Sequence, residues 1–250
     1  MNRFGVLGVA LLSLLASTGC TRSITLKYNP GVSLNKAVKS SSARLGIARF
    51  EDKRAWVKPN DSESESFISS AGPWKFGLGY KGKEYMPVNE LVQELFVEEF
   101  QRGGLNAQPL DNQGEFDEDA LRQLGQERQL EYVLSGKILS FEFANDTGMV
   151  TVDSRRTVTL ALDILRVDGK TPSTSQLFTE TMNENEGMGV LHSTNVDKLV
   201  NDVFKKVLGQ VILKVSDQMA VDANNVALRV RINGVEHPLL ASAMLEQGNN

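Results

Sequence analysis

The feature that most constrains the fold is a long, one-sided apolar stripe near the C-terminus. Between residues 196 and 221, apolar side chains recur at alternating steps of three and one residues. This spacing predicts a single amphipathic helix roughly 39 Å long at 1.5 Å per residue, with a capping box at residues 194–197. Such a face must be covered, either by a sheet of the same chain or by a partner, and we expect a sheet. The stripe consists of Val196, Leu199, Val200, Val203, Phe204, Val207, Leu208, Val211, Ile212, Val215 and Met219.

Residues that alternate between apolar and polar supply the strands of that sheet. Residues 158–164 carry apolar side chains at even positions and mostly polar ones between, which is typical of a strand with one face on a core. With residues 132–143 they predict a long antiparallel hairpin with a turn at 145–148, and residues 173–182 add a weaker third strand. Shorter strands are predicted at residues 23–28, 44–50 and 105–110.

Two further helices are predicted before the hairpin. Residues 88–103 show helical apolar spacing, begin after Pro87 and end at Gly103 and Gly104. Residues 117–130 begin with three acidic side chains at the positive end of the helix. The chain therefore reads as an α+β domain over residues 44–221, with a mixed or antiparallel sheet and helices packed on one face.

Two stretches lie outside these predicted helices and the predicted sheet. Residues 51–84 show no lasting spacing and are predicted to form a long loop. Around Asn233 and Gly234, residues 226–232 and 235–239 carry a hairpin signal, so residues 222–250 are interpreted as a C-terminal hairpin and tail.

The N-terminus has the pattern of an export signal. Arg3 precedes a 13-residue apolar stretch at 4–16, which is too short to span a bilayer and predicts a cleaved signal peptide at residues 1–19. Residues 15–20 resemble a bacterial lipobox, although Ser17 stands where leucine is commonest. This resemblance implies lipidation of Cys20, and two or three acyl chains at about 0.8 kcal/mol per methylene would hold the protein on a membrane. Residues 20–43 then form the lipidated N-terminus and a tether. In lipoproteins of this type an aspartate after the cysteine commonly retains the protein in the inner membrane, so the resemblance, with Thr21 at that position, implies a periplasm-facing place on the outer membrane.

Charge and cysteine content exclude several classes of function. The 250 residues include 27 basic and 31 acidic side chains, a formal net charge of −4, which does not fit a nucleic-acid binder. A single cysteine excludes an internal disulfide and a cysteine-based metal or iron–sulfur site. His192 and His237 are the only histidines and neither belongs to a metal-binding motif. We expect no cofactor and no metal.

Motifs that suggest catalysis or nucleotide binding fail on their context. Residues 77–83 match a glycine-rich phosphate loop, but Glu84 follows where serine or threonine is required. Residues 33–36 match SxxK without the companion motifs of penicillin-recognising enzymes. Glu98 and Glu99 are interpreted as part of a solvated helix face. No catalytic set remains, and we predict that the protein is not an enzyme.

One stretch combines aromatic and cationic side chains in an otherwise acidic protein. Such rings are typical of binding patches, so the stretch is the candidate site for a periplasmic protein or glycan. The alternative is that the rings are buried when the segment folds over the sheet, and the sequence leaves both open. The acidic run 61–65 could hold calcium weakly or remain solvated. The candidate patch consists of Trp74, Lys75, Phe76, Tyr80, Lys81, Lys83 and Tyr85.

Residues 45–54, the glycine-containing residues 76–79 and the helix at 88–103 resemble the YajG-like bacterial outer-membrane lipoproteins. The order of elements is also similar to the periplasmic domain of CsgG-type secretion lipoproteins. The resemblance implies a non-enzymatic lipoprotein that assists envelope assembly or transport. The insertion at 61–72 and the C-terminal hairpin depart from that pattern, and residues 149–164 lack the apolar belt of a membrane pore.

The sequence therefore favours a lipid-anchored, non-enzymatic accessory module that binds or assembles a partner at the periplasmic side of the outer membrane. A structural subunit of an oligomeric secretion or transport machine is the alternative. An envelope hydrolase is a third hypothesis, and it would require an acid–base pair that converges in a pocket.

Overall fold

The structure is a computed structural model that describes residues 22–34, 38, 41–58, 61–71, 74–114, 116–147, 151–187 and 199–231. The predicted signal peptide 1–19, Cys20, both histidines and residues 232–250 lie outside the described residues. Within them the chain is a mixed α+β fold with two sheets, which confirms the predicted fold class.

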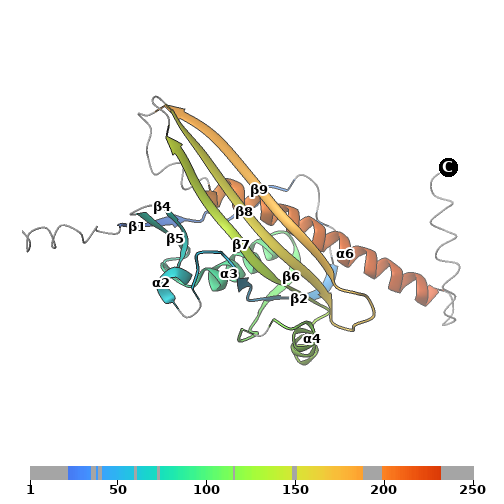
Figure 1. The fold of residues 1–250 in the computed structure, drawn as a ribbon. Helices are drawn as coiled ribbons and strands as arrows, with labels where there is room; N and C mark the ends of the chain where they lie inside the picture. The colour runs from blue at the N-terminus through green and yellow to red at the C-terminus, as the bar shows by residue number, and fades with distance from the viewer. Residues whose placement is uncertain are drawn as a thin grey trace, which may run out of the picture.

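The larger sheet has the strand order β6-β2-β7-β8-β9, with β3 beside β7 (Figure 1). Strand β2 runs parallel to both of its neighbours, whereas β7, β8 and β9 form an antiparallel meander. The predicted long hairpin is confirmed, but the turn predicted at 145–148 is wrong up to residue 147, because β7 stays paired with β8 that far. The strands are β2 Ser41–Ala48, β3 Glu51–Asp52, β6 Leu105–Leu110, β7 Tyr132–Thr147, β8 Thr151–Arg166 and β9 Thr174–Gly187.

The smaller sheet joins segments that are distant in sequence. Its order is β1-β5-β4, formed by β1 Arg22–Lys27, β4 Phe67–Ala71 and β5 Trp74–Gly79. Strand β1 pairs parallel to β5, about fifty residues later in the chain, and β4 pairs antiparallel to β5. The predicted loop at residues 51–84 is therefore wrong. Its strands are only five and six residues long, and each is held by pairing: β5 lies between β1 and β4, and β4 pairs with β5 alone among the described strands of this sheet.

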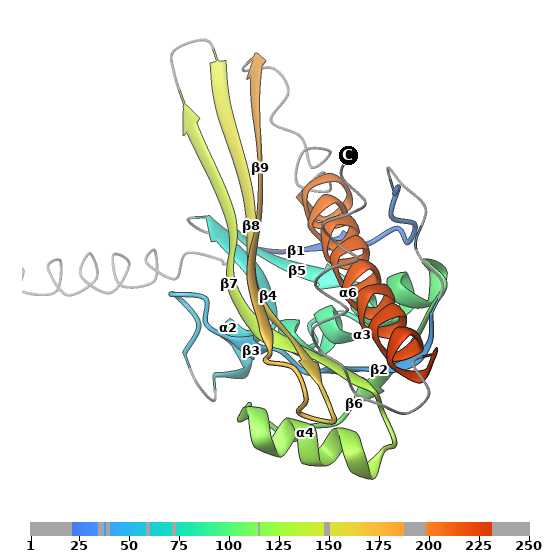
Figure 2. The same cartoon turned by 90° about the vertical axis from the view of Figure 1, so that its right-hand side faces the viewer.

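The C-terminal helix covers one face of the larger sheet, as its apolar stripe predicted. A π-helical turn, η2 Leu199–Phe204, leads into α6 Lys205–Arg231, which lies along one face of β7, β8 and β9 with α3 Val88–Arg102 beside it (Figure 2). The stripe residues from Val203 to Met219 are buried in the main core. Helix α4 Glu118–Glu127 instead packs on a second, smaller cluster that includes Ala48, Val133 and Leu165.

The C-terminal region departs from the prediction. Helix α6 continues to Arg231, so the strand predicted at 226–232 is wrong through residue 231. Apolar residues at 226, 228 and 230 alternate as in a strand, yet here they extend a helix that is already nucleated and packed over the preceding six turns. The rest of the predicted hairpin lies outside the described residues.

Candidate functional site

The candidate patch lies on β5, on the turn after it and on the approach to α3. Phe76 is 4% exposed and Tyr80 is 5% exposed, and both belong to the main core. The Tyr80 hydroxyl donates to Glu98 of α3. These two rings are therefore packing residues and do not present a surface to a partner.

The three lysines of the patch each pair with a carboxylate of the same chain. Lys75 pairs with Glu63. In the turn between the bridge residues Tyr80 and Lys83, the Lys81 ammonium lies 2.5 Å from Glu98, and Lys83 pairs with Glu94. The last two pairs fix this turn onto α3, so the cations are largely neutralised rather than offered to an anionic ligand.

Tyr85 and Trp74 complete the patch. Tyr85 is 43% exposed and has a positive φ of 58°. Its ring lies over Gly77, where an added Cβ would be 3.2 Å from it, and meets the Phe67 ring edge-on with centroids 5.7 Å apart. For Trp74 the structure describes the backbone, which pairs with Arg22 on one side and Ala71 on the other. Whether these residues bind a partner stays a prediction.

Glu99 was interpreted as solvated, and this is wrong, because the residue is only 1% exposed. Its carboxylate accepts hydrogen bonds from the Tyr28 hydroxyl at 2.7 Å and from the backbone N–H groups of Gly31 and Val32 at 2.7 and 3.1 Å. The segment after β1 folds back over α3 and covers this helix face. Burial, followed by the hydrogen bond to Glu99, raises the pKa of the Tyr28 hydroxyl above its ordinary range.

The acidic run at residues 61–65 has a local structural role. Asp61 is the N-cap of the short helix α2 Ser62–Glu65 and accepts from the Glu63 backbone N–H. Glu63 is engaged with Lys75. Among the described residues, no group of three or more histidine, cysteine, aspartate or glutamate side chains is arranged to hold a metal ion.

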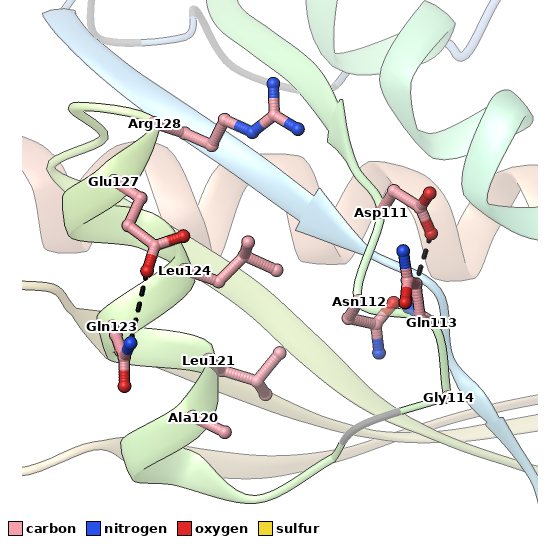
Figure 3. A pocket seen from close by; sticks show the side chains of 10 residues that line it. All are labelled: Asp111, Asn112, Gln113, Gly114, Ala120, Leu121, Gln123, Leu124, Glu127 and Arg128. Carbon is pink, nitrogen blue, oxygen red and sulfur yellow. Dashed lines mark hydrogen bonds between the residues drawn. The ribbon is translucent and has the colours of Figure 1, made fainter.

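A groove that the sequence did not predict lies between α4 and the loop after β6 (Figure 3). It has a volume of about 590 Å³. Leu121 and Leu124 line it from α4, with Glu127 and Arg128 at the C-terminal end of that helix. The opposite wall is the loop at residues 111–114, and the end of β2 passes between the two walls.

Hydrogen bonds to Arg49 and within the loop hold the second wall of the groove in place. Asn112 is buried, accepts from the Arg49 backbone N–H at 2.9 Å and donates to the Arg49 carbonyl at 3.3 Å, which fixes the loop to the end of β2. Asp111 accepts from the Gln113 backbone N–H at 3.2 Å. Gln113 and Gly114 both have positive φ, and they turn the chain toward α4.

The walls of the groove are largely polar. They carry amides and charges of both signs above two leucines. Ligand pockets of this size usually have mostly apolar walls, so a polar partner fits better than an apolar small molecule. Sequence reasoning missed the groove because its residues come from two separate segments and follow no spaced motif.

Comparison with known proteins gives matches among solved structures alone. No family model matches the chain, and no curated protein matches it. Among solved structures, a Xanthomonas campestris protein of family DUF330 aligns with a TM-score of 0.47 and 12% identity, over 80% of this chain and 99% of that one. A PelC dodecamer subunit from Paraburkholderia phytofirmans aligns at 0.35 and 9%, over 74% and 93%. Lipoprotein GNA1162 from Neisseria meningitidis aligns at 0.26 and 13%, over 71% and 98%. Likeness at this level carries no functional assignment to this chain.

Among the described helices, none is long and apolar enough to cross a membrane.

Proposed function

We propose that the chain is a YajG-like lipoprotein: a lipid-anchored, non-enzymatic accessory module at the periplasmic side of the outer membrane. The observation that carries the proposal is the distance from the lipobox-like cysteine to the fold. Strand β1 begins at Arg22, two residues after Cys20, and is paired along its whole length with β5. A lipid on Cys20 would therefore hold the folded body directly at the bilayer surface, because two residues span at most about 7 Å.

The groove between α4 and the 111–114 loop supplies the binding function. Helix α4, which lines the groove, lies away from β1 in both overall views (Figures 1 and 2), so an anchored molecule leaves the groove open to a partner. Mixed charges and amides on its walls suit a polar segment of a periplasmic protein better than an apolar ligand. The two carboxylates of the groove, Asp111 and Glu127, accept hydrogen bonds from Gln113 and Gln123 of their own walls (Figure 3), which supports a binding role over hydrolysis.

Two measurements test the anchor and the groove separately. Intact-mass analysis of the protein from native membranes should show acylated Cys20, and Cys20→Ser should remove the lipid mass and release the protein from the membrane. Crosslinking followed by affinity purification should recover one envelope partner with the wild type. Arg128→Glu in the groove should weaken this recovery, whereas Lys170→Glu, an exposed charge reversal outside the groove, should not. Equal recovery with both variants would refute the groove as the partner site.

A second candidate, the subunit of an oligomeric envelope machine, is favoured by the edge of the larger sheet. Strand β9 is 14 residues long and, within the described part of the chain, pairs only with β8. Leu177 on this strand is 60% exposed. Unpaired long edges pair readily with other chains, and an inserted lysine blocks such pairing. Light scattering should then give an oligomer for the wild type and a monomer for Leu177→Lys; a monomeric wild type would refute this candidate.

A further inference from the structure

The positive charge of the groove beside α4 is gathered at one end. Among the described residues that line the groove, Arg128 is the one cation, and its side chain points away from the end of α4 toward the opposite wall (Figure 3). Arg44 of β2 lies at the same end, because its guanidinium is 3.5 Å from the side-chain oxygen of Gln129, the residue after Arg128. Both arginines are exposed to solvent.

These two arginines have no acidic partner in the described part of the chain. In contrast, five other arginines each form an ion pair with an aspartate or a glutamate at 2.5–3.2 Å. A guanidinium presents five N–H donors in a planar fork that fits a carboxylate. Arg44 and Arg128 therefore keep donors for an anion that comes from another molecule. The five paired arginines are Arg49, Arg54, Arg102, Arg122 and Arg166.

The remaining walls of the groove suit an extended peptide. Gln113 on the loop and Gln123 on α4 are exposed, and each side-chain amide carries both donors and an acceptor, as the backbone of an extended segment does. The large apolar residues among the described lining are Leu121 and Leu124. An amphipathic helix requires a broader apolar groove than two leucines form, and a proline-rich segment requires aromatic rings.

An added strand is disfavoured as well, because the nearest edge of the larger sheet is blocked. Strand β6 forms this edge. Pro109 has no backbone N–H, and the Ala107 carbonyl already accepts from the Gln101 side chain at 2.8 Å. A peptide beside α4 must then be recognised by side chains, and arginine clusters are a common means of recognising acidic motifs.

We propose that the groove binds an extended acidic segment of the periplasmic partner, with carboxylate side chains of that segment on Arg128 and Arg44. The inference rests on the proposed function, in which the groove is the partner site, and adds the chemistry of the partner. The formal net charge of the chain is −4, so its overall charge does not attract an acidic segment. Selection of such a segment depends on the two arginines.

A selection from a library of short random peptides tests this chemistry without the native partner. The protein purified from membranes in detergent is immobilised, and the selected peptides are then measured by fluorescence anisotropy. We expect enrichment of aspartate and glutamate, and binding that weakens as salt is raised from about 0.05 to 0.5 M. Arg128→Gln and Arg44→Gln should each weaken binding about fivefold, which corresponds to about 1 kcal/mol. Lys170→Gln, an exposed position outside the groove, is the matched control and should leave binding unchanged.

Peptides without acidic enrichment, or equal binding by the wild type and both arginine variants, would overturn the inference. Thermal unfolding checks that the variants are folded, which we expect because both positions are exposed. The crosslinking experiment separates the two proposals. Equal partner recovery with Arg128→Glu and Lys170→Glu defeats the groove as the partner site, whereas recovery that depends on Arg128 without acidic enrichment of the peptides defeats only the acidic segment.

Discussion

The buried carboxylate of Glu99 gives the sharpest test of how the segment after β1 is held. It accepts from one hydroxyl and two backbone N–H groups at 2.7–3.1 Å, and all three donors belong to residues 28–32. Glu99→Gln keeps one oxygen, which can still serve two of the donors, but it turns an amide NH₂ toward the third. One buried donor is then left unpaired, at a cost of about 1.5–3 kcal/mol.

This cost should appear as a lower melting temperature. For a chain of this size each kcal/mol corresponds to about 2–4 °C, so Glu99→Gln should melt about 3–12 °C below the wild type. The measurements are thermal and urea unfolding of the signal-free Cys20→Ser chain, with an unchanged urea m-value. Hydrogen exchange should also show lost protection at the Gly31 and Val32 amides.

A matched control lies on the same helix. Glu94 pairs with Lys83 where both side chains are partly exposed, so Glu94→Gln should cost less than about 1 kcal/mol. If the two glutamines lower stability equally, or if the Gly31 and Val32 amides stay protected in Glu99→Gln, the buried carboxylate does not hold this segment and the reasoning fails.

Two further predictions concern buried phenols and one glycine. Burial raises the pKa of both Tyr28 and Tyr132, helped by hydrogen bonds to carboxylates, so these phenols stay protonated in the folded state while the unfolded chain ionises them near pH 10. Their stabilising contribution is complete below that pH and is lost as pH rises above it, by up to about 1.4 kcal/mol per pH unit for each group. Urea midpoints between pH 9 and 11.5 should therefore fall more steeply for the wild type than for the double phenylalanine variant, and parallel curves would contradict this. Gly136 in β7 has a φ of +151°, and an added Cβ would overlap a backbone carbonyl oxygen of β8. Gly136→Ala should cost about 3 kcal/mol or more, against about 1 kcal/mol for Gly114→Ala, where φ is also positive but the space is open; similar urea midpoints for the two would show that the steric argument is wrong.

Sequence patterns predicted the helices and strands in which apolar residues recur at regular spacing over a long segment. The helix at α3, the meander of β7 to β9 and the apolar stripe of α6 all fall into this class. The short strands β4 and β5 did not, because five and six residues are too few for their spacing to define a strand alone. The burial of Glu99 was missed for a related reason: local spacing places it beside solvated residues, and only the returning segment after β1 covers it.

For the candidate sites, too, the sequence indicated composition but not which side chains are exposed or brought together. The aromatic and cationic composition of residues 74–85 was visible in the sequence, but the structure assigns Phe76 and Tyr80 to the core and pairs the lysines with carboxylates. The groove beside α4 gave no signal, since its two walls are about ten residues apart and consist of ordinary surface side chains.

The sequence by itself determined the mixed α+β class, the main helices and the long meander, because these depend on periodic burial that each segment encodes locally. It also contains the residues from which an export signal and a lipobox before Cys20 are predicted. Only the tertiary structure decided that β1 pairs with β5, that the Tyr85 ring meets Phe67 of β4, and that the segment after β1 covers Glu99. These relations join residues far apart in the chain, and their free energy comes from contacts that exist only once the whole core has formed.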